Sequence, residues 1–135
     1  ELPRDLAYNK DGARVECTID NLPQDAQFID IGAQTIADYQ ALLASAKTIF
    51  ANGPAGIYEQ DGFDVGTRGI WGGIADSDAY SVIGGGDTVS SATKFIDLTK
   101  ISYVCTAGGA MVRFMSGKKL PLIAAMEQAY ERQKL

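Results

Sequence analysis

Three glycine-bearing segments follow apolar, strand-like runs and could bind an anion through backbone amides. They are "ANGPAG" (51–56), "IGGGDT" (83–88) and "CTAGG" (105–109). Glycine leaves backbone N–H groups accessible because it has no Cβ, and a helix beginning at such a loop adds partial positive charge. Ligands of open parallel sheets bind outside the carboxyl ends of the strands. We therefore expect the three segments to share one sheet edge and to bind phosphate.

The middle segment adds a hydroxyl and an acid to the glycines. Gly85 and Gly86 would expose amides to a phosphate, and Thr88 could donate its hydroxyl to it. Asp87 would repel a bare phosphate unless a cation lay between them, and Mg²⁺ takes one or two carboxylates together with phosphate oxygens. The alternative is a tight glycine turn followed by Asp87 as a helix N-cap. The segment does not match the GxGxxG dinucleotide fingerprint.

The flanking segments each allow two interpretations. Asn52 and Gly53 open a turn, and Glu59 follows at a place where a carboxylate could accept two ribose hydroxyls. Alternatively, Glu59 is a solvated loop acid. Thr106 to Gly109 are similar to a second anion site at a helix N-terminus. Alternatively, these residues provide ordinary close packing of a helix on a strand.

The composition limits the classes of function. The chain has 135 residues, 12 basic and 17 acidic, and an acidic chain is a poor binder of nucleic acid. The absence of histidine excludes Ser-His-Asp and Cys-His catalysis and His-ligated zinc. No apolar run is long enough to cross a membrane, and no basic and apolar leader opens the chain. Cys17 and Cys105 form no CxxC motif, so we expect reduced thiols and a cytoplasmic protein.

The apolar pattern predicts a hairpin turning at Asp11 and Gly12, followed by alternating strands and helices. Because "YSVI" and "ISYVC" are apolar on both faces of the strand, we expect a parallel sheet with helices on both sides. Thr35 is the predicted N-cap of the first helix. Strands are expected in 27–32, 47–56, 79–87 and 100–109, with the first ended by Gly32, the second running into a Gly/Pro loop and the last ending in a glycine pair, and helices in 34–46, 63–77, 88–97, 110–117 and 120–133.

Taken in order, four segments resemble the carboxyl-terminal part of phosphoglycerate kinases. They are "DIG" (30–32), "ANGPAGIYE" (51–59), "VIGGGDT" (82–88) and "CTAGGAMVRFMSGKKLP" (105–121), and "LPRDLAY" (2–8) is similar to the family's LPxD strand. The resemblance implies a three-layer α/β/α, Rossmann-like, mostly parallel sheet that forms an incomplete domain. Residues 1–135 would then be the carboxyl-terminal portion of the nucleotide-binding domain, with the amino-terminal triose-binding domain absent.

The resemblance also implies an activity. Phosphoglycerate kinases move a phosphoryl group between 1,3-bisphosphoglycerate and ADP, with Mg²⁺, in glycolysis. Mg-ADP or Mg-ATP would bind to this chain, and 3-phosphoglycerate and 1,3-bisphosphoglycerate would bind through the missing domain. The family's nucleotide lysines lie upstream of the matching region, so the fragment alone is expected to be inactive. Nucleic acid and membrane are not expected partners.

Carried over by motif, the resemblance assigns roles to twelve residues. Asp87 would bind Mg²⁺, and Glu59 would bind the ribose hydroxyls. Thr106, Gly108 and Gly109 would be catalytic, where the moving phosphoryl group meets a helix N-terminus. Two departures affect this region: Ala107 replaces the first glycine of the family's TGGGA, and Arg113 lies near a place where the family usually has a Glu. The nucleotide-binding set would be Asn52, Gly53, Ala55, Tyr58, Glu59, Gly85, Gly86, Asp87 and Thr88.

Two other classes of function remain open at this stage. The chain could be a non-catalytic module that binds Mg-nucleotide weakly through "GGGDT" and Glu59. It could also be a structural fragment that self-associates, because half of a parallel sheet exposes a strand edge and an apolar face.

Overall fold

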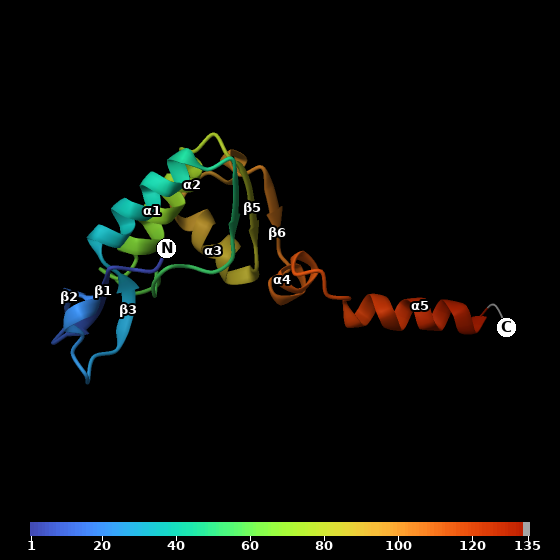
Figure 1. Cartoon of the computed structure of the whole chain (residues 1–135), viewed down its shortest axis with the longest axis horizontal. Helices are drawn as coiled ribbons and strands as arrows, with labels where there is room; N and C mark the ends of the chain where they lie inside the picture. The colour runs from blue at the N-terminus through green and yellow to red at the C-terminus, as the bar shows by residue number, and fades with distance from the viewer. Residues whose placement is uncertain (134–135) are drawn as a thin grey trace.

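The computed structural model describes residues 1–133, which form two three-stranded sheets and five α-helices (Figure 1). The first sheet is antiparallel, in the order β2-β1-β3, and contains β1 (Asp5–Lys10), β2 (Ala13–Thr18) and β3 (Phe28–Ile31). The second is parallel, in the order β4-β5-β6, and contains β4 (Thr48–Ala51), β5 (Tyr80–Gly84) and β6 (Tyr103–Cys105). The helices are α1 (Ala33–Ser45), α2 (Val65–Ala75), α3 (Gly86–Phe95), α4 (Gly109–Met115) and α5 (Pro121–Gln133), with 3₁₀ turns at Ile19–Asn21 and Leu98–Lys100.

The predicted hairpin is confirmed. Asp11 and Gly12 both have positive φ, 53° and 87°, as a two-residue hairpin turn requires. Asn9 accepts a hydrogen bond from the Gly12 amide at 2.8 Å, and Lys10 pairs with Ala13.

The α/β class and the parallel sheet are confirmed, but the place predicted for the strand in 27–32 is wrong. This strand, β3, pairs antiparallel with β1, with Leu6 opposite Ile31, and does not join the parallel sheet. The hairpin leaves the second edge of β1 free, and β3 returns along it. The other edge of β3 is occupied by the loop 52–64, where the Ile57 amide donates to the Ile29 carbonyl at 2.9 Å.

The main core lies on one face of the parallel sheet. Ile49 of β4 and Ile83 of β5 pack with Trp71 and Ile74 of α2 and with Ala92 of α3. The indole Nε1 of Trp71, a side chain only 2% exposed, donates to the Ser91 hydroxyl at 3.0 Å. This bond satisfies the polar atom of the largest core residue and ties α2 to α3.

The opposite face of the sheet is only partly covered. Met111 of α4 packs so closely on Gly84 that a Cβ there would overlap its thioether. Phe50, Tyr80 and Tyr103, however, are 42%, 58% and 54% exposed. Figure 1 shows α5 extending away from the rest of the molecule. Helices α2 and α3 therefore cover most of one face, although Val104 of β6 stays 37% exposed there, and α4 covers only part of the other face, where cover by helices was also predicted.

A buried carboxylate from β1 caps α1, and the prediction that Thr35 is its N-cap is wrong. The helix begins after Gly32, and Thr35 lies within its first turn. Asp5 accepts from the Gln34 and Thr35 amides at 2.9 and 2.8 Å and from the Thr35 hydroxyl. The cap thus comes from a strand 30 residues away and not from the helix itself.

The hydrogen bonds at Asp5 make the stability of the fold sensitive to acid. Burial alone would raise the pKa of Asp5, but the bonds from the Thr35 hydroxyl and the two amides outweigh it and lower the pKa below 3.8. A lowered pKa in the folded state stabilises the protein above the unfolded pKa. This contribution is lost as the pH falls through the folded pKa.

Asp5→Asn is expected to lower the free energy of unfolding at pH 7 by about 2 kcal/mol, because the charge and one cap acceptor are lost. Urea unfolding at pH 7 and at a pH well below 3.8 would measure this, and the variant should also lose less stability on acidification than the wild type. Asp38→Asn is the control, because Asp38 forms only an exposed ion pair with Arg4, and it should change stability little. Equal losses in the two variants would contradict the role of Asp5.

Candidate functional site

The three glycine-bearing segments meet at the carboxyl edge of the parallel sheet, as predicted. The strands β4, β5 and β6 run parallel, with Ala51 opposite Ile83 and Gly84 opposite Cys105. The loops that follow them enclose one pocket of about 260 Å³. Its lining contains Asn52, Gly53, Pro54, Gly85, Gly86, Asp87, Thr88 and Gly108.

Gly85 forms the turn at which the three loops converge. Its φ of 104° and ψ of 145° lie in a region that essentially only glycine adopts. Its amide donates to the Cys105 carbonyl at 3.1 Å, which joins the loop after β5 to the end of β6. A Cβ on Gly85 would lie 3.0 Å from the side-chain Nδ2 of Asn52 and 3.5 Å from the Gly108 Cα. The backbone conformation and the packing of the three loops therefore both require glycine at position 85.

Two side chains of the site hold the loops together. Asn52 donates through Nδ2 to the Gly84 carbonyl at 2.6 Å, and the Gly53 amide donates to the Thr88 hydroxyl oxygen at 2.6 Å. Thr88 is only 1% exposed, so its hydroxyl faces the Gly53 turn and not open solvent. Both residues thus fix the loop after β4 against the start of α3.

The start of α3 leaves space that the protein does not fill. The N-cap is Gly85, and Asp87 lies in the first turn, so the alternative with Asp87 as the N-cap is wrong. Gly86 and Asp87 are both exposed. A Cβ built on Gly86 would meet no atom within 4 Å among the described residues. Because the first amides of a helix have no acceptor within it, these groups are available to a ligand.

The loop after β6 contributes Gly108 to the pocket. Thr106 and Gly109 are exposed beside it but outside its lining, and a Cβ on Gly109 also meets nothing within 4 Å in residues 1–133. Ala107, which replaces a family glycine, lines an apolar groove with Met111 on the other side of the loop. Its methyl group therefore does not enter the pocket.

Arg113, the second departure from the family pattern, closes the turn between α4 and α5. Its Nε donates to the Lys119 carbonyl at 2.9 Å. The side chain is thus directed along its own helix end and away from the pocket lining.

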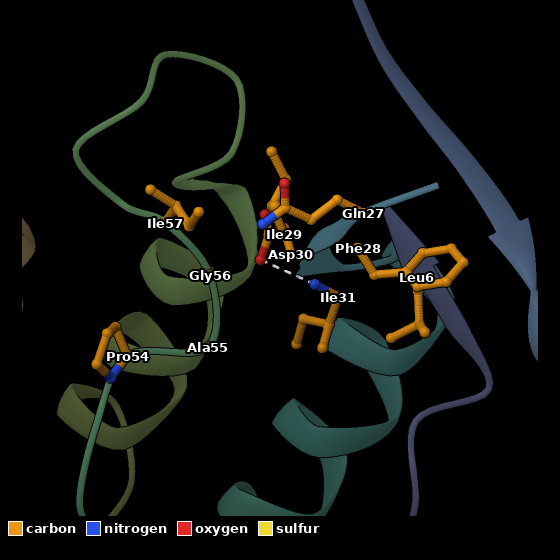
Figure 2. Close-up of a pocket in the computed structure, with 10 residues that line it drawn as sticks. All are labelled: Leu6, Gln27, Phe28, Ile29, Asp30, Ile31, Pro54, Ala55, Gly56 and Ile57. Carbon is orange, nitrogen blue, oxygen red and sulfur yellow. Dashed lines mark hydrogen bonds between the residues drawn. The ribbon is translucent and has the colours of Figure 1, made fainter. Parts of the chain in front are cut away.

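The remaining predicted residues lie on the loop 52–64. Ala55 lines a separate cleft of about 320 Å³. Figure 2 shows Pro54 to Ile57 along one wall of this cleft and the β3 residues along the other. Tyr58 is half-buried and Glu59 is exposed, outside both hollows. Burial raises the pKa of Tyr58, and the carboxylates of Glu59 and Asp87 raise it further.

A buried carboxylate that the motif analysis missed supports this loop. Asp30, whose side chain is fully buried, accepts from Arg14 at 2.7 Å, from the Gly66 amide at 3.0 Å and from the Ile31 amide at 2.9 Å. A Cβ on Gly56 would lie 2.4 Å from Asp30 Oδ1. The segment "DIG" contains this aspartate, but only the folded chain shows that it caps α2 and packs under the loop.

The described residues contain no cluster of side chains that could bind a metal ion by itself. Over residues 1–133 no group of three or more Cys, Asp or Glu side chains is placed to hold an ion. A single exposed carboxylate, Asp87, fits the mode in which Mg²⁺ takes one protein ligand and the oxygens of a phosphate. Across the same residues, none of the helices is long and apolar enough to cross a membrane.

Comparison with known proteins identifies the family. The model of the phosphoglycerate kinase family matches residues 1–118. The chain is 43% identical over 130 residues to the phosphoglycerate kinase of Methanothermus fervidus and 45% identical over 125 residues to that of Methanopyrus kandleri. These matches cover 96% and 93% of this chain but 32% and 31% of the relatives. The chain belongs to the phosphoglycerate kinase family and spans about a third of the length of these relatives.

Solved structures agree with this assignment. Phosphoglycerate kinase from Coxiella burnetii superposes with a TM-score of 0.82 at 40% identity, covering 92% of this chain and 33% of that one. The enzyme from Pyrococcus horikoshii gives a TM-score of 0.79 at 38% identity, covering 96% and 33%. The fold is therefore that of a phosphoglycerate kinase segment.

The two neighbouring glycines of α3 should respond differently to alanine. Gly85→Ala should lower the free energy of unfolding by about 1–3 kcal/mol, because its backbone conformation excludes a Cβ. Gly86→Ala should leave stability unchanged within about 1 kcal/mol, because the new methyl group meets open space. Urea unfolding of both variants would measure the difference. Equal destabilisation would show that Gly86 is required for packing and not for ligand access.

Proposed function

We propose that the chain is the nucleotide-side portion of a phosphoglycerate kinase that moves a phosphoryl group between 1,3-bisphosphoglycerate and ADP with Mg²⁺. Residues 1–135 would form the carboxyl-terminal part of its nucleotide-binding domain. The triose-binding domain would lie in the rest of the enzyme, which would act in the cytoplasm. The observation that carries this proposal is the unfilled space at Gly86, at the convergence of three strand ends.

The phosphates of the nucleotide would bind at the start of α3. The amides of Gly86 to Thr88 supply donors, since that of Gly85 is already bonded to the Cys105 carbonyl, and the helix N-terminus supplies partial positive charge. Asp87 is exposed in the first turn, where it would bind Mg²⁺ that also contacts the phosphate oxygens. Asn52 and Gly53 would line the same cradle, since they are fixed to Gly84 and Thr88.

The ribose and the transferred group would lie on either side of these phosphates. Glu59 would accept hydrogen bonds from two ribose hydroxyls, with Tyr58 and Ala55 lining the approach. Thr106, Gly108 and Gly109 would lie near the moving phosphoryl group, since Gly108 borders the pocket and a side chain is missing at Gly109.

The charge of the transferred group must be neutralised from elsewhere. No Lys or Arg lies among the residues that line the described pocket. Phosphoryl transfer depends on positioning and on cations that stabilise charge in the transition state. We therefore propose that this chain binds Mg-nucleotide without turning it over, while the remainder of the enzyme supplies the cations and the triose site.

Titration of the chain with ADP, with and without Mg²⁺, tests the site. Backbone amide NMR should show shifts at Gly85, Gly86, Asp87 and Thr88 that require Mg²⁺. Asp87→Asn should weaken Mg-ADP binding at least tenfold, because the metal loses its protein ligand. Asp78→Asn, which changes another exposed aspartate, is the matched control and should bind as the wild type does.

Two results would contradict this assignment. One is the absence of shifts at these amides in a protein with a well-dispersed spectrum, which would place the binding affinity outside this chain. The other is Mg²⁺-dependent binding that survives Asp87→Asn, which would place the metal on another residue.

A second candidate function is structural, because the outer face of the parallel sheet is apolar and exposed. Phe50, Tyr80 and Tyr103 lie on this face, and Phe114 and Met115 of α4 continue it at 66% and 62% exposure. Apolar patches of this kind mark interaction surfaces. The edge strands β4 and β6 add unpaired backbone groups within the described sheet. The chain by itself would then self-associate through this edge and face.

Sedimentation equilibrium at several concentrations tests the structural candidate. The wild-type chain should gain mass as its concentration rises. Tyr103→Glu should weaken the association about tenfold, because it places a charge in the apolar face. Leu42→Glu, which changes an exposed leucine of α1, should not alter it. A monomer at every concentration would exclude self-association.

A further inference from the structure

The turn that carries Glu59 is held from outside by a lysine of α3. The Gln60 amide donates to the Ile57 carbonyl at 3.0 Å, so residues 57–60 form a β-turn with Tyr58 and Glu59 at its centre. Lys94 donates through Nζ to the Tyr58 carbonyl at 2.8 Å. That carbonyl belongs to the peptide between Tyr58 and Glu59, which is the central peptide of the turn.

The central peptide of a β-turn is the one that its own hydrogen bond does not fix. Type I and type II turns differ by rotation of this peptide, and type II requires positive φ at the third residue. Glu59 is not among the positive-φ residues of the described chain, so the turn is not of type II. The Lys94 ammonium binds the carbonyl oxygen in this orientation and so opposes rotation. The direction of the Glu59 side chain depends on the same rotation.

The aromatic rings of Tyr58 and Phe95 hold the Lys94 ammonium in place. The Lys94 Nζ lies 5.6 Å from the Tyr58 ring centroid and 5.3 Å from that of Phe95. The two rings meet edge to face with centroids 6.3 Å apart. Arg68 of α2 lies over Phe95 at 5.0 Å and pairs with Asp64 at 2.6 Å. Cation–π attraction holds such ammonium groups over aromatic faces.

One helix links the two ends of the proposed site. Asp87, in the first turn of α3, and Lys94, in its last, are seven residues or about 10 Å apart along the helix axis. The helix therefore carries the phosphate cradle at its N-terminus and holds the ribose turn near its C-terminus. Its length sets the separation between the two.

We propose that Lys94 is a positioning residue that orients Glu59 for the nucleotide ribose. The proposal rests on the proposed function, because it takes Glu59 as the ligand of the ribose hydroxyls. Lys94 itself touches neither nucleotide nor metal. It acts by fixing the Tyr58–Glu59 peptide, so its removal should affect recognition of the ribose and leave the phosphate cradle intact.

Amide hydrogen exchange without ligand tests the first step. In Lys94→Met, which keeps the length of the side chain but loses its charge and donor, the Gln60 amide should exchange about tenfold faster. The Val89 amide, which bonds to Gly85 at 3.0 Å, should keep its wild-type rate. Lys94→Arg should restore slow exchange. Lys100→Met, which removes an exposed lysine paired with Asp76, is the control. An unchanged Gln60 rate in Lys94→Met would overturn the proposal.

Titrations with Mg-ADP and with its 2′,3′-dideoxy analogue test the second step. Lys94→Met should weaken Mg-ADP binding about fivefold and leave binding of the dideoxy analogue unchanged, whereas a general structural defect would weaken both. Equal losses for the two ligands would overturn the proposal, as would a wild-type chain that does not discriminate between them. A wild-type chain that binds neither refutes nucleotide binding itself, and the exchange rates then decide whether Lys94 orders the turn.

Discussion

The positive-φ turn at Gly85 is the constraint on which the site depends. It ends β5 and begins α3. It also brings the loops after β4 and β6 so close that a Cβ built on Gly85 would lie 3.0 Å from Asn52 Nδ2 and 3.5 Å from the Gly108 Cα. The Gly85 amide bonds to Cys105, and Asn52 reaches the Gly84 carbonyl. If this turn were replaced by ordinary backbone, α3 would start in another direction and its first amides would not face the other two loops. The pocket is thus a consequence of chain geometry more than of any reactive side chain.

Two buried aspartates give this edge a rigid support. Asp5 caps α1 and Asp30 caps α2, and both carboxylates come from the antiparallel sheet. Asp30 is fully buried and paired with Arg14, whose side chain is 17% exposed. Removing one partner of such a pair leaves an uncompensated buried charge, which is costly even where the pair itself contributes little. The antiparallel sheet therefore fixes the positions of α1 and α2. Through the contact of Asp30 with Gly56 it also supports the loop that carries Glu59.

The exposed outer face fits a segment that spans a third of its relatives' length. A complete α/β sheet buries both faces under helices. Here Phe50, Tyr80 and Tyr103 stay exposed on a face whose strands are as apolar as those of the core. The described lining of the pocket contains no lysine or arginine.

The amino-acid sequence by itself determined the hairpin, the helices, the parallel strands and the loops at their carboxyl ends. It could do so because apolar periodicity and glycine positions are local signals. The motifs also carried the family and the candidate residues Asn52, Glu59 and Asp87. Only the tertiary structure decided which strands pair. The partner of β3 is set by the free edge of β1, and the apolar pattern of β3 itself does not indicate that partner. The tertiary structure also decided the cap of α1 by Asp5 and the contact of Lys94 with Tyr58, because these join residues at least 30 positions apart and depend on the packing of whole elements.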